Sequence, residues 1–239
     1  MSHGQGEKVE IDVREHGANQ QTTDRRLFMQ LVAFGDCFDP KPLVRTLEAS
    51  RIEAALYRDM NDPRGIAVLG MSEDPAFFVN GFRDLLNAPS FEELPQKFEY
   101  TMLGRTYASG FESDLDDWLL RRPRKTALNP AWPWAVWYPL RRTGSFARLT
   151  PQEQGTIIRE HSVIGRAYGE ADLVHDVRLA CHGLDVRDND FVIGLVGKGL
   201  HPLSHIVQRM RTTVQTSQYL QTLGPFFIGH AVWQSPLPH

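Results

Sequence analysis

His161 lies in a segment whose spacing predicts an amphipathic helix. Thr150, followed by Pro151 and then by Glu153 at the third helical position, is typical of a helix start. We expect the helix to span residues 151–168, with an apolar stripe that consists of Ile157, His161, Ile164 and Tyr168. A neutral imidazole that points at the core from an apolar face can ligate a haem iron, or it can be a core histidine bonded to a carboxylate or a carbonyl.

A run of aromatic residues followed by two arginines is the second candidate site. Residues 132–142 read WPWAVWYPLRR, and residues 134–140 predict a strand. Alternation along a strand places Tyr138 on the face of Trp134 and Val136, which we expect to point inward. An apolar pocket with Arg141 and Arg142 at its rim would suit a large planar ligand that carries carboxylates. The alternative is an aromatic core strand that ends at solvent.

Three other histidines are weaker candidates as ligands. His201 and His205 are spaced i, i+4, but no carboxylate or third ligand is near them in the sequence, so we expect a surface role at a helix end. His175 shares a predicted strand face with Val177 and Leu179 and could reach a ligand cavity.

The elements that must position these residues follow one order twice. In the first half we expect strands at 27–34, 54–57, 66–69 and 98–107, with helices that begin near residues 39 and 74. In the second half we expect strands at 134–140, 173–181, 191–196 and 226–233, with helices at 151–168 and 203–219. Both halves read β-α-β-β-α-β, which predicts an α+β fold of two tandem ferredoxin-like units in a barrel-like arrangement.

This order divides the chain into three parts. Residues 1–26 are a polar arm that we expect to pack poorly unless a partner subunit orders it. Residues 27–120 form the first ferredoxin-like half, and residues 121–239 form the second, which carries the candidate site. The junction at 118–133 contains three prolines and is rich in arginine and tryptophan, so we expect a packed segment rather than a free linker.

Composition and charge exclude several classes of protein. The chain has 239 residues, 41% of them hydrophobic and 23% charged, which is typical of a globular protein. Its net charge of −3 argues against non-specific binding of nucleic acid. Two cysteines, Cys37 and Cys181, argue against a disulfide scaffold and a cysteine zinc site, and they fit a reducing cytoplasm. No apolar run is long enough to span a membrane, and the polar N-terminus does not read as a secretory signal.

Three segments of the chain resemble the chlorite dismutase superfamily and, more closely, its coproheme decarboxylase branch. They are Tyr138-Pro139-Leu140-x-Arg142, Glu160-His161-x-x-Ile164-Gly165-Arg166-x-Tyr168, and a tail that contains Met210-Arg211 and the sequence GPFFIG at 224–229. The resemblance covers most of residues 27–233. It implies a homopentamer that binds a porphyrin substrate and converts iron coproporphyrin III (coproheme) to haem b with hydrogen peroxide. The substrate's own iron then serves as the redox centre, and no separate cofactor is implied.

The resemblance also implies roles for individual residues. His161 matches the proximal iron ligand, and Tyr138 matches the tyrosine that becomes a radical and takes hydrogen from a propionate. Arg142 stands where the family has a lysine that holds the reacting propionate, and Leu140 stands where it has a methionine that packs on the macrocycle. The remaining substrate-binding positions that the resemblance implies are Tyr107, Arg124, Arg166, Arg211 and Thr216.

The residue that handles peroxide is where the sequence departs from the family pattern. The branch has a distal glutamine 13 residues after the proximal histidine, and this position is Val174 here; a two-residue shift would place Asp176 there. His175 lies between them and is a candidate general base. Three alternatives stay open: a chlorite dismutase, which makes chloride and O₂ from chlorite, a haem-binding protein without turnover, and a barrel that binds no haem.

Overall fold

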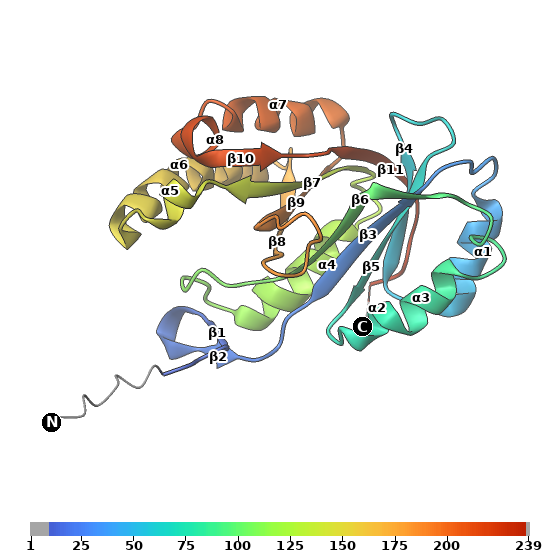
Figure 1. The fold of residues 1–239 in the computed structure, drawn as a ribbon, viewed down its shortest axis with the longest axis horizontal. Helices are drawn as coiled ribbons and strands as arrows, with labels where there is room; N and C mark the ends of the chain where they lie inside the picture. Colours follow the sequence, from blue (N-terminus) through green and yellow to red (C-terminus); the bar gives the residue numbers. More distant parts are fainter. Residues whose placement is uncertain (1–9, 238–239) are drawn as a thin grey trace, which may run out of the picture.

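The computed structural model of the chain describes residues 10–237, and their strands form one large and one small antiparallel sheet (Figure 1). The small sheet pairs β1 (Glu15–His16) with β2 (Thr22–Thr23). The large sheet consists of β3 (Phe28–Phe34), β4 (Ala54–Asp59), β5 (Ile66–Ser72), β6 (Gln96–Arg105), β7 (Trp134–Arg142), β8 (His175–Ala180), β9 (Phe191–Gly197), β10 (Leu220–Leu223) and β11 (Phe227–Gln234). The order is β10-β7-β11-β4-β5-β3-β6-β8-β9, and β7 also pairs with β9. The sheet therefore closes on itself as a barrel, with β10 beside β7.

The two halves of the barrel have the same topology. The first half pairs its strands in the order β4-β5-β3-β6, and the second half pairs the corresponding strands in the order β8-β9-β7-β11. The helices are α1 (Lys41–Ser50), α2 (Ala76–Val79), α3 (Gly81–Leu86), α4 (Arg122–Ala127), α5 (Gly144–Ala147), α6 (Pro151–Glu170), α7 (Leu200–Met210) and α8 (Val214–Tyr219). The predicted pair of ferredoxin-like units is confirmed.

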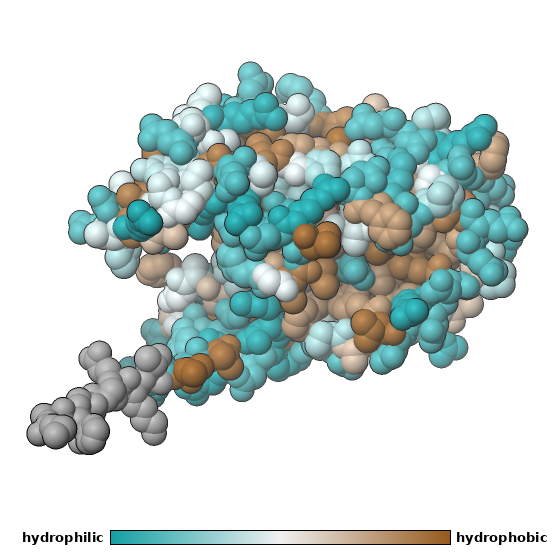
Figure 2. Space-filling model, in the orientation of Figure 1, coloured by the Kyte–Doolittle hydropathy of each residue, from teal (hydrophilic) through white to brown (hydrophobic). Residues whose placement is uncertain are grey.

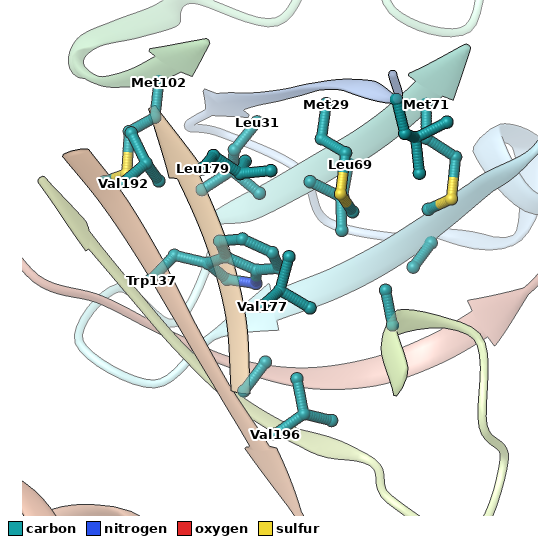
Figure 3. Close-up of a cluster of buried hydrophobic side chains, with 14 of the residues drawn as sticks. Met29, Leu31, Leu69, Met71, Met102, Trp137, Val177, Leu179, Val192 and Val196 are labelled. Atoms are coloured by element: carbon teal, nitrogen blue, oxygen red, sulfur yellow. The ribbon is translucent and has the colours of Figure 1, made fainter. Parts of the chain in front are cut away.

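The inside of the barrel is filled by apolar side chains from both halves. Met29 and Leu31 come from β3, Leu69 and Met71 from β5, and Trp137 from β7 (Figure 3). Trp137 is completely buried. Because side chains alternate along a strand, Tyr138 points to the outer face of the sheet, where helices cover it. The expectation that the face of Tyr138 points inward is therefore wrong: its neighbour Trp137 fills the interior.

Helices cover the outer faces of the two half-sheets unequally. On the first half, α1 and α3 bury Leu47 and Phe82 against the sheet. On the second half, α7 buries Leu203 and Ile206 in the same way. The long helix α6, by contrast, has no fully buried residue, although a capping box at Thr150 and Glu153 starts it as predicted. α6 is therefore held mainly by its contacts with α7, α8 and β8.

Several elements differ from the sequence-based expectation. The helix expected at 203–219 is divided into α7 and α8, because Thr213 caps a new helix with its side chain. The helix expected from residue 74 is divided at Asn80, whose φ of −118° and ψ of −101° are not helical. The strand β10, which follows α8 directly, is not among the expected elements. The junction at 118–133 forms a widened helical turn, η2 (Asp117–Arg121), and then α4.

The described part of the N-terminal arm is anchored at several residues, among them Glu15, Gln21 and Arg25. Glu15 accepts hydrogen bonds from the Arg105 guanidinium (3.0 Å) and from the backbone N–H of Ala108 (2.9 Å). Most other residues of 10–26 are exposed or half-buried, and residues 1–9 of the predicted arm lie outside the described range. Among the helices of residues 10–237, none is both long and apolar enough to cross a membrane.

Candidate functional site

A cleft of about 870 Å³ lies between α6 and the second half-sheet. Its walls are α6 on one side and, on the other, β8, the segment that follows β6, and the η2–α4 turn. Figure 2 shows the surface hollowed between the lobe that carries α5 and α6 and the lobe that carries β1 and β2. Tyr107 and Trp118 line the cleft, so the cleft also draws on residues that precede 121, outside the half expected to carry the site.

The cleft is positively charged, although the chain as a whole is not. It is lined by four arginines and two acidic residues, namely Arg122, Arg142, Arg159, Arg178, Asp176 and Glu112. The Glu112 carboxylate accepts hydrogen bonds from the backbone N–H groups of Ser109, Gly110 and Phe111, so its charge is directed at its own loop. This excess of cations suits an anionic ligand.

Arg142 presents a guanidinium that forms no ion pair with any acidic side chain of residues 10–237. Its Cζ lies 4.5 Å from the centroid of the Phe146 ring and 4.7 Å from that of Phe191. Its Nε is buried and has no hydrogen-bond partner in the described part of the chain, while its backbone N–H donates to Asp190 (2.7 Å). Burial lowers the pKa of this side chain, because the cation loses solvation between the two rings. A ligand carboxylate would satisfy the side chain with paired hydrogen bonds.

Tyr107 lines the same part of the cleft. Its ring centroid lies 5.5 Å from that of Phe191, and burial raises the pKa of its phenol. Tyr107 can therefore donate a hydrogen bond to an anion beside Arg142, which agrees with the substrate-binding position that the resemblance implies.

Tyr138 and Leu140 lie on the same face of β7 as Arg142, but they are buried behind the cleft wall. The Tyr138 ring stacks on Phe226, with 4.6 Å between the centroids. Burial raises the pKa of the Tyr138 phenol, so it stays protonated at physiological pH.

His161 faces the junction of α7 and α8 instead of the cleft. Its Nε2 lies 3.2 Å from the Thr216 hydroxyl and 3.4 Å from that of Thr213, and its Nδ1 is buried with no partner among the residues that the structure describes. The neighbouring Glu160 accepts a hydrogen bond from the backbone N–H of Val214 (2.8 Å). Burial lowers the pKa of His161, so the ring is a neutral imidazole with a lone pair available to a metal.

The lowered pKa of His161 predicts an acid-sensitive fold. As the pH falls below about 6.5, the unfolded chain takes up the proton before the folded chain does, so the free energy of unfolding decreases. Urea midpoints of the wild type at pH 7.5 and pH 5.5 should differ by more than those of His161→Asn. An equal decrease in both proteins would contradict this.

The three candidates for the peroxide-handling position have separate surroundings. Val174 is buried and packs under α6 and α7. His175 stacks on Trp132, with 3.5 Å between ring centroids and 10° between planes, and its Nε2 lies 2.9 Å from Asp172. Of the three, only Asp176 lines the cleft.

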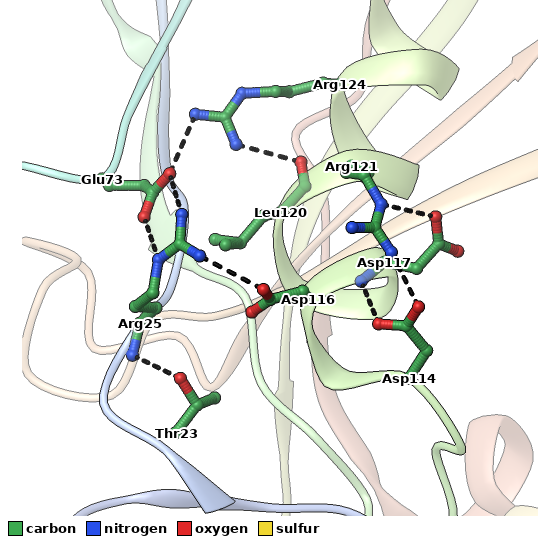
Figure 4. A network of polar contacts seen from close by, with 9 residues as sticks. All are labelled: Thr23, Arg25, Glu73, Asp114, Asp116, Asp117, Leu120, Arg121 and Arg124. Carbon is green, nitrogen blue, oxygen red and sulfur yellow. Dashed lines mark hydrogen bonds and ion pairs between the residues drawn. The ribbon is translucent and has the colours of Figure 1, made fainter.

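Arg124 lies in a different part of the molecule from the cleft. It is 9% exposed, and its guanidinium contacts Glu53 (2.5 Å), Glu73 (3.6 Å) and the carbonyl of Leu120. Figure 4 shows the contacts of Arg124 with Glu73 and Leu120, and Arg25, which joins Glu73 to Asp116. Two residues earlier in the chain, Arg122 lines the cleft. The composition of the junction gives no reason to separate these two arginines, because their directions depend on the helical turn that forms there.

The remaining candidates lie around α6 and α7. Arg166 is exposed on α6, and Arg211 is exposed just after α7. His205 contacts the Tyr168 hydroxyl (2.5 Å), and the ring centroids of His201 and His205 are 5.9 Å apart. Within residues 10–237, no group of three or more His, Cys, Asp or Glu side chains could hold a metal ion. Cys37 and Cys181 are both free and buried.

Comparisons with known proteins agree with this fold. The family model of chlorite dismutase matches residues 80–232. A haem-binding protein from Thermus thermophilus superposes with a TM-score of 0.67 at 18% identity, covering 88% of this chain and 92% of that one. Chlorite dismutase from Candidatus Nitrospira defluvii in complex with imidazole superposes with a TM-score of 0.66 at 14% identity, covering 90% and 93%. No curated protein sequence matches the chain.

Proposed function

Since the chain belongs to the chlorite dismutase family, we propose that it binds coproheme in the cleft and converts it to haem b with hydrogen peroxide. The observation that carries this proposal is Arg142, a partly buried guanidinium aimed into a cationic cleft and without an acidic partner in the described chain. A cleft of about 870 Å³ is within the usual range for a small-molecule site. Coproheme, with four carboxylates on a flat ring, matches the charge of the cleft.

The reaction needs one oxidant for each carboxylate that is lost. One propionic acid side chain and one H₂O₂ give one vinyl group, one CO₂ and two H₂O, so two turns give haem b. Bound coproheme supplies the iron that reacts with peroxide. Arg142 would hold the carboxylate, and Tyr138 holds a proton that it can lose together with an electron, which would let it accept a hydrogen atom from the propionate. Tyr138 does not line the cleft, so this step also requires a movement that brings the propionate and the phenol together. Leu140, between them on β7, keeps this face apolar.

His161 is the proposed iron ligand. Its chemistry fits, because a neutral imidazole is the form that binds iron. Its orientation requires a movement, because Nε2 must leave the hydroxyls of Thr213 and Thr216. Because α6 has no fully buried side chain, we expect this movement to have a small free-energy cost. Tyr107 remains a proposed substrate contact, whereas the other proposed positions do not line the cleft and would each have to move to reach it, namely Thr216, Arg124, Arg166, Arg211 and His175.

One observation favours a second candidate function. Arg178 lines the cleft from β8, so an arginine is available on this wall for an anionic oxidant such as chlorite. Under this alternative the haem-loaded protein would convert chlorite to chloride and O₂. The pentamer that the resemblance implies stays a proposal. The cytoplasmic location that the cysteine content suggests and the division of the chain at 120/121 stay proposals as well.

A titration followed by mass spectrometry tests the proposed function. We expect the protein to shift the Soret band of coproheme, and peroxide should then remove first one and then two carboxyl groups from the porphyrin. Binding without a change in mass, and O₂ release from chlorite by a haem-loaded sample, would instead support the second candidate. No binding of any porphyrin would contradict both.

Replacement of Arg142 should weaken the binding of coproheme. Arg142→Met removes a charge-assisted contact, and we expect the dissociation constant to rise by about tenfold or more. Arg141→Met is a matched control, because Arg141 pairs with Asp188 (2.7 Å) and does not line the cleft. Equal affinities of the two variants would contradict the role of Arg142.

A further inference from the structure

Two arginines of the cleft wall are held against one indole ring. The Cζ atoms of Arg122 and Arg178 lie 4.5 Å and 5.1 Å from the ring centroid of Trp118. The indole is itself fixed, because its Nε1–H donates to the carbonyl of Tyr107 (3.0 Å). This arrangement orders two flexible side chains that come from different elements, α4 and β8.

Asp176 bridges the same two arginines. Its Oδ1 lies 3.1 Å from Arg122 Nη2, and its Oδ2 lies 2.7 Å from Arg178 Nε. Each carboxylate oxygen therefore contacts one guanidinium, and no other acidic side chain in the described residues pairs with either arginine. Two guanidiniums that share one carboxylate keep most of their N–H groups free and retain a net positive charge.

We propose that Arg122 and Arg178 form a second carboxylate-binding site, which Asp176 occupies until a carboxylate of the ligand displaces it. The inference rests on the proposed function and specifies its substrate class. With Arg142 as the first site, the cleft selects a porphyrin that has more carboxylates over a porphyrin that has fewer.

The surroundings of Tyr107 connect the two sites. Tyr107 lines the cleft together with Arg142 and Arg178, and its backbone carbonyl holds Trp118. Arg142, Arg122 and Arg178 all line the same cleft, so a ligand with several carboxylates can contact both sites. The planar, pre-ordered guanidiniums favour paired contacts with a carboxylate at a small entropic cost.

Iron-free porphyrins test this inference without any contribution from iron ligation. The probes are coproporphyrin III, which has four carboxylates, and protoporphyrin IX, which has two on one edge; binding is followed by quenching of tryptophan fluorescence. We expect the wild type to prefer coproporphyrin III. Arg178→Met and Arg122→Met should each raise its dissociation constant by about tenfold and leave protoporphyrin IX less affected. Arg121→Met is the matched control, because Arg121 pairs with Asp114 (2.7 Å) outside the cleft.

Asp176→Asn distinguishes displacement from a purely structural role. If Asp176 competes with the ligand, its loss should tighten binding of coproporphyrin III by about two- to fivefold, as expected for a partly exposed ion pair. Weaker binding by Asp176→Asn would overturn the displacement model. Unchanged binding of coproporphyrin III by Arg122→Met and Arg178→Met would overturn the second site while leaving the proposed function intact. Failure of the wild type to bind either porphyrin would overturn the proposed function itself. Thermal unfolding of each variant checks that the fold is retained.

Discussion

Tyr138→Phe should bind coproheme as tightly as the wild type and fail to convert it. The substitution removes only the phenolic hydroxyl, while the stacking of the ring on Phe226 is retained. A phenylalanine ring cannot exchange a hydrogen atom with the propionate, so we expect the rate of CO₂ loss to fall by about 100-fold or more, equivalent to about 2.7 kcal/mol at the transition state. Single-turnover mass spectrometry after addition of peroxide measures this rate.

Tyr107→Phe is the matched control for this experiment. Tyr107 also lies near Arg142, but the proposed role of its hydroxyl is only to bind the substrate. This variant should therefore bind coproheme more weakly and still remove both carboxyl groups at saturation. Normal turnover by Tyr138→Phe would remove the tyrosine from the mechanism and weaken the case for decarboxylation.

Trp137→Ala should cause the largest loss of stability. Trp137 is completely buried inside the barrel, and its ring covers Gly194, where an added Cβ would lie 2.5 Å from the indole. Removal of this ring leaves a large cavity between the two halves of the barrel. We expect the free energy of unfolding to decrease by about 3–5 kcal/mol, as measured by urea denaturation.

Trp137→Phe provides the comparison on the same site. It keeps an apolar ring and should lose clearly less stability than the alanine variant. Because the indole Nε1 has no hydrogen-bond partner among the described residues, its removal costs no polar contact. Equal losses for the two variants would show that packing of the ring does not determine the stability of the barrel.

The sequence predicted the doubled topology because each strand and helix carries its own local signal. The apolar run at 28–34 and the capping box at Thr150 are examples, and both elements form where expected. The helix boundaries that were predicted wrongly depend on single residues. Thr213, for example, caps a new helix, but the apolar pattern continues through it and gives no sign of a break. The inward direction expected for Tyr138 was wrong. Alternation separates the two faces of a strand, but which face points into the barrel depends on how the barrel closes.

The candidate site was harder to predict because its residues meet only in three dimensions. Arg122, Trp118 and Asp176 come from separate segments, and nothing in their spacing indicates that one indole orders two guanidiniums. Periodicity placed His161 on the inner stripe of its helix but could not say that this stripe faces Thr213 and Thr216. Motif matches predicted residue types and their positions in the sequence. The direction of each side chain, however, depends on how the helices pack on the sheet.

The pairing of β11 with β4 has a consequence for synthesis on the ribosome. Ala55 pairs with Gln234, so the first half-sheet keeps an open edge on β4 until β11, about 180 residues later, has emerged. Open strand edges are templates for pairing with other chains, and pairings between distant residues form slowly. The nascent chain therefore has a long interval in which the half-finished barrel is exposed to aggregation. A chain truncated before β11 would never leave that state.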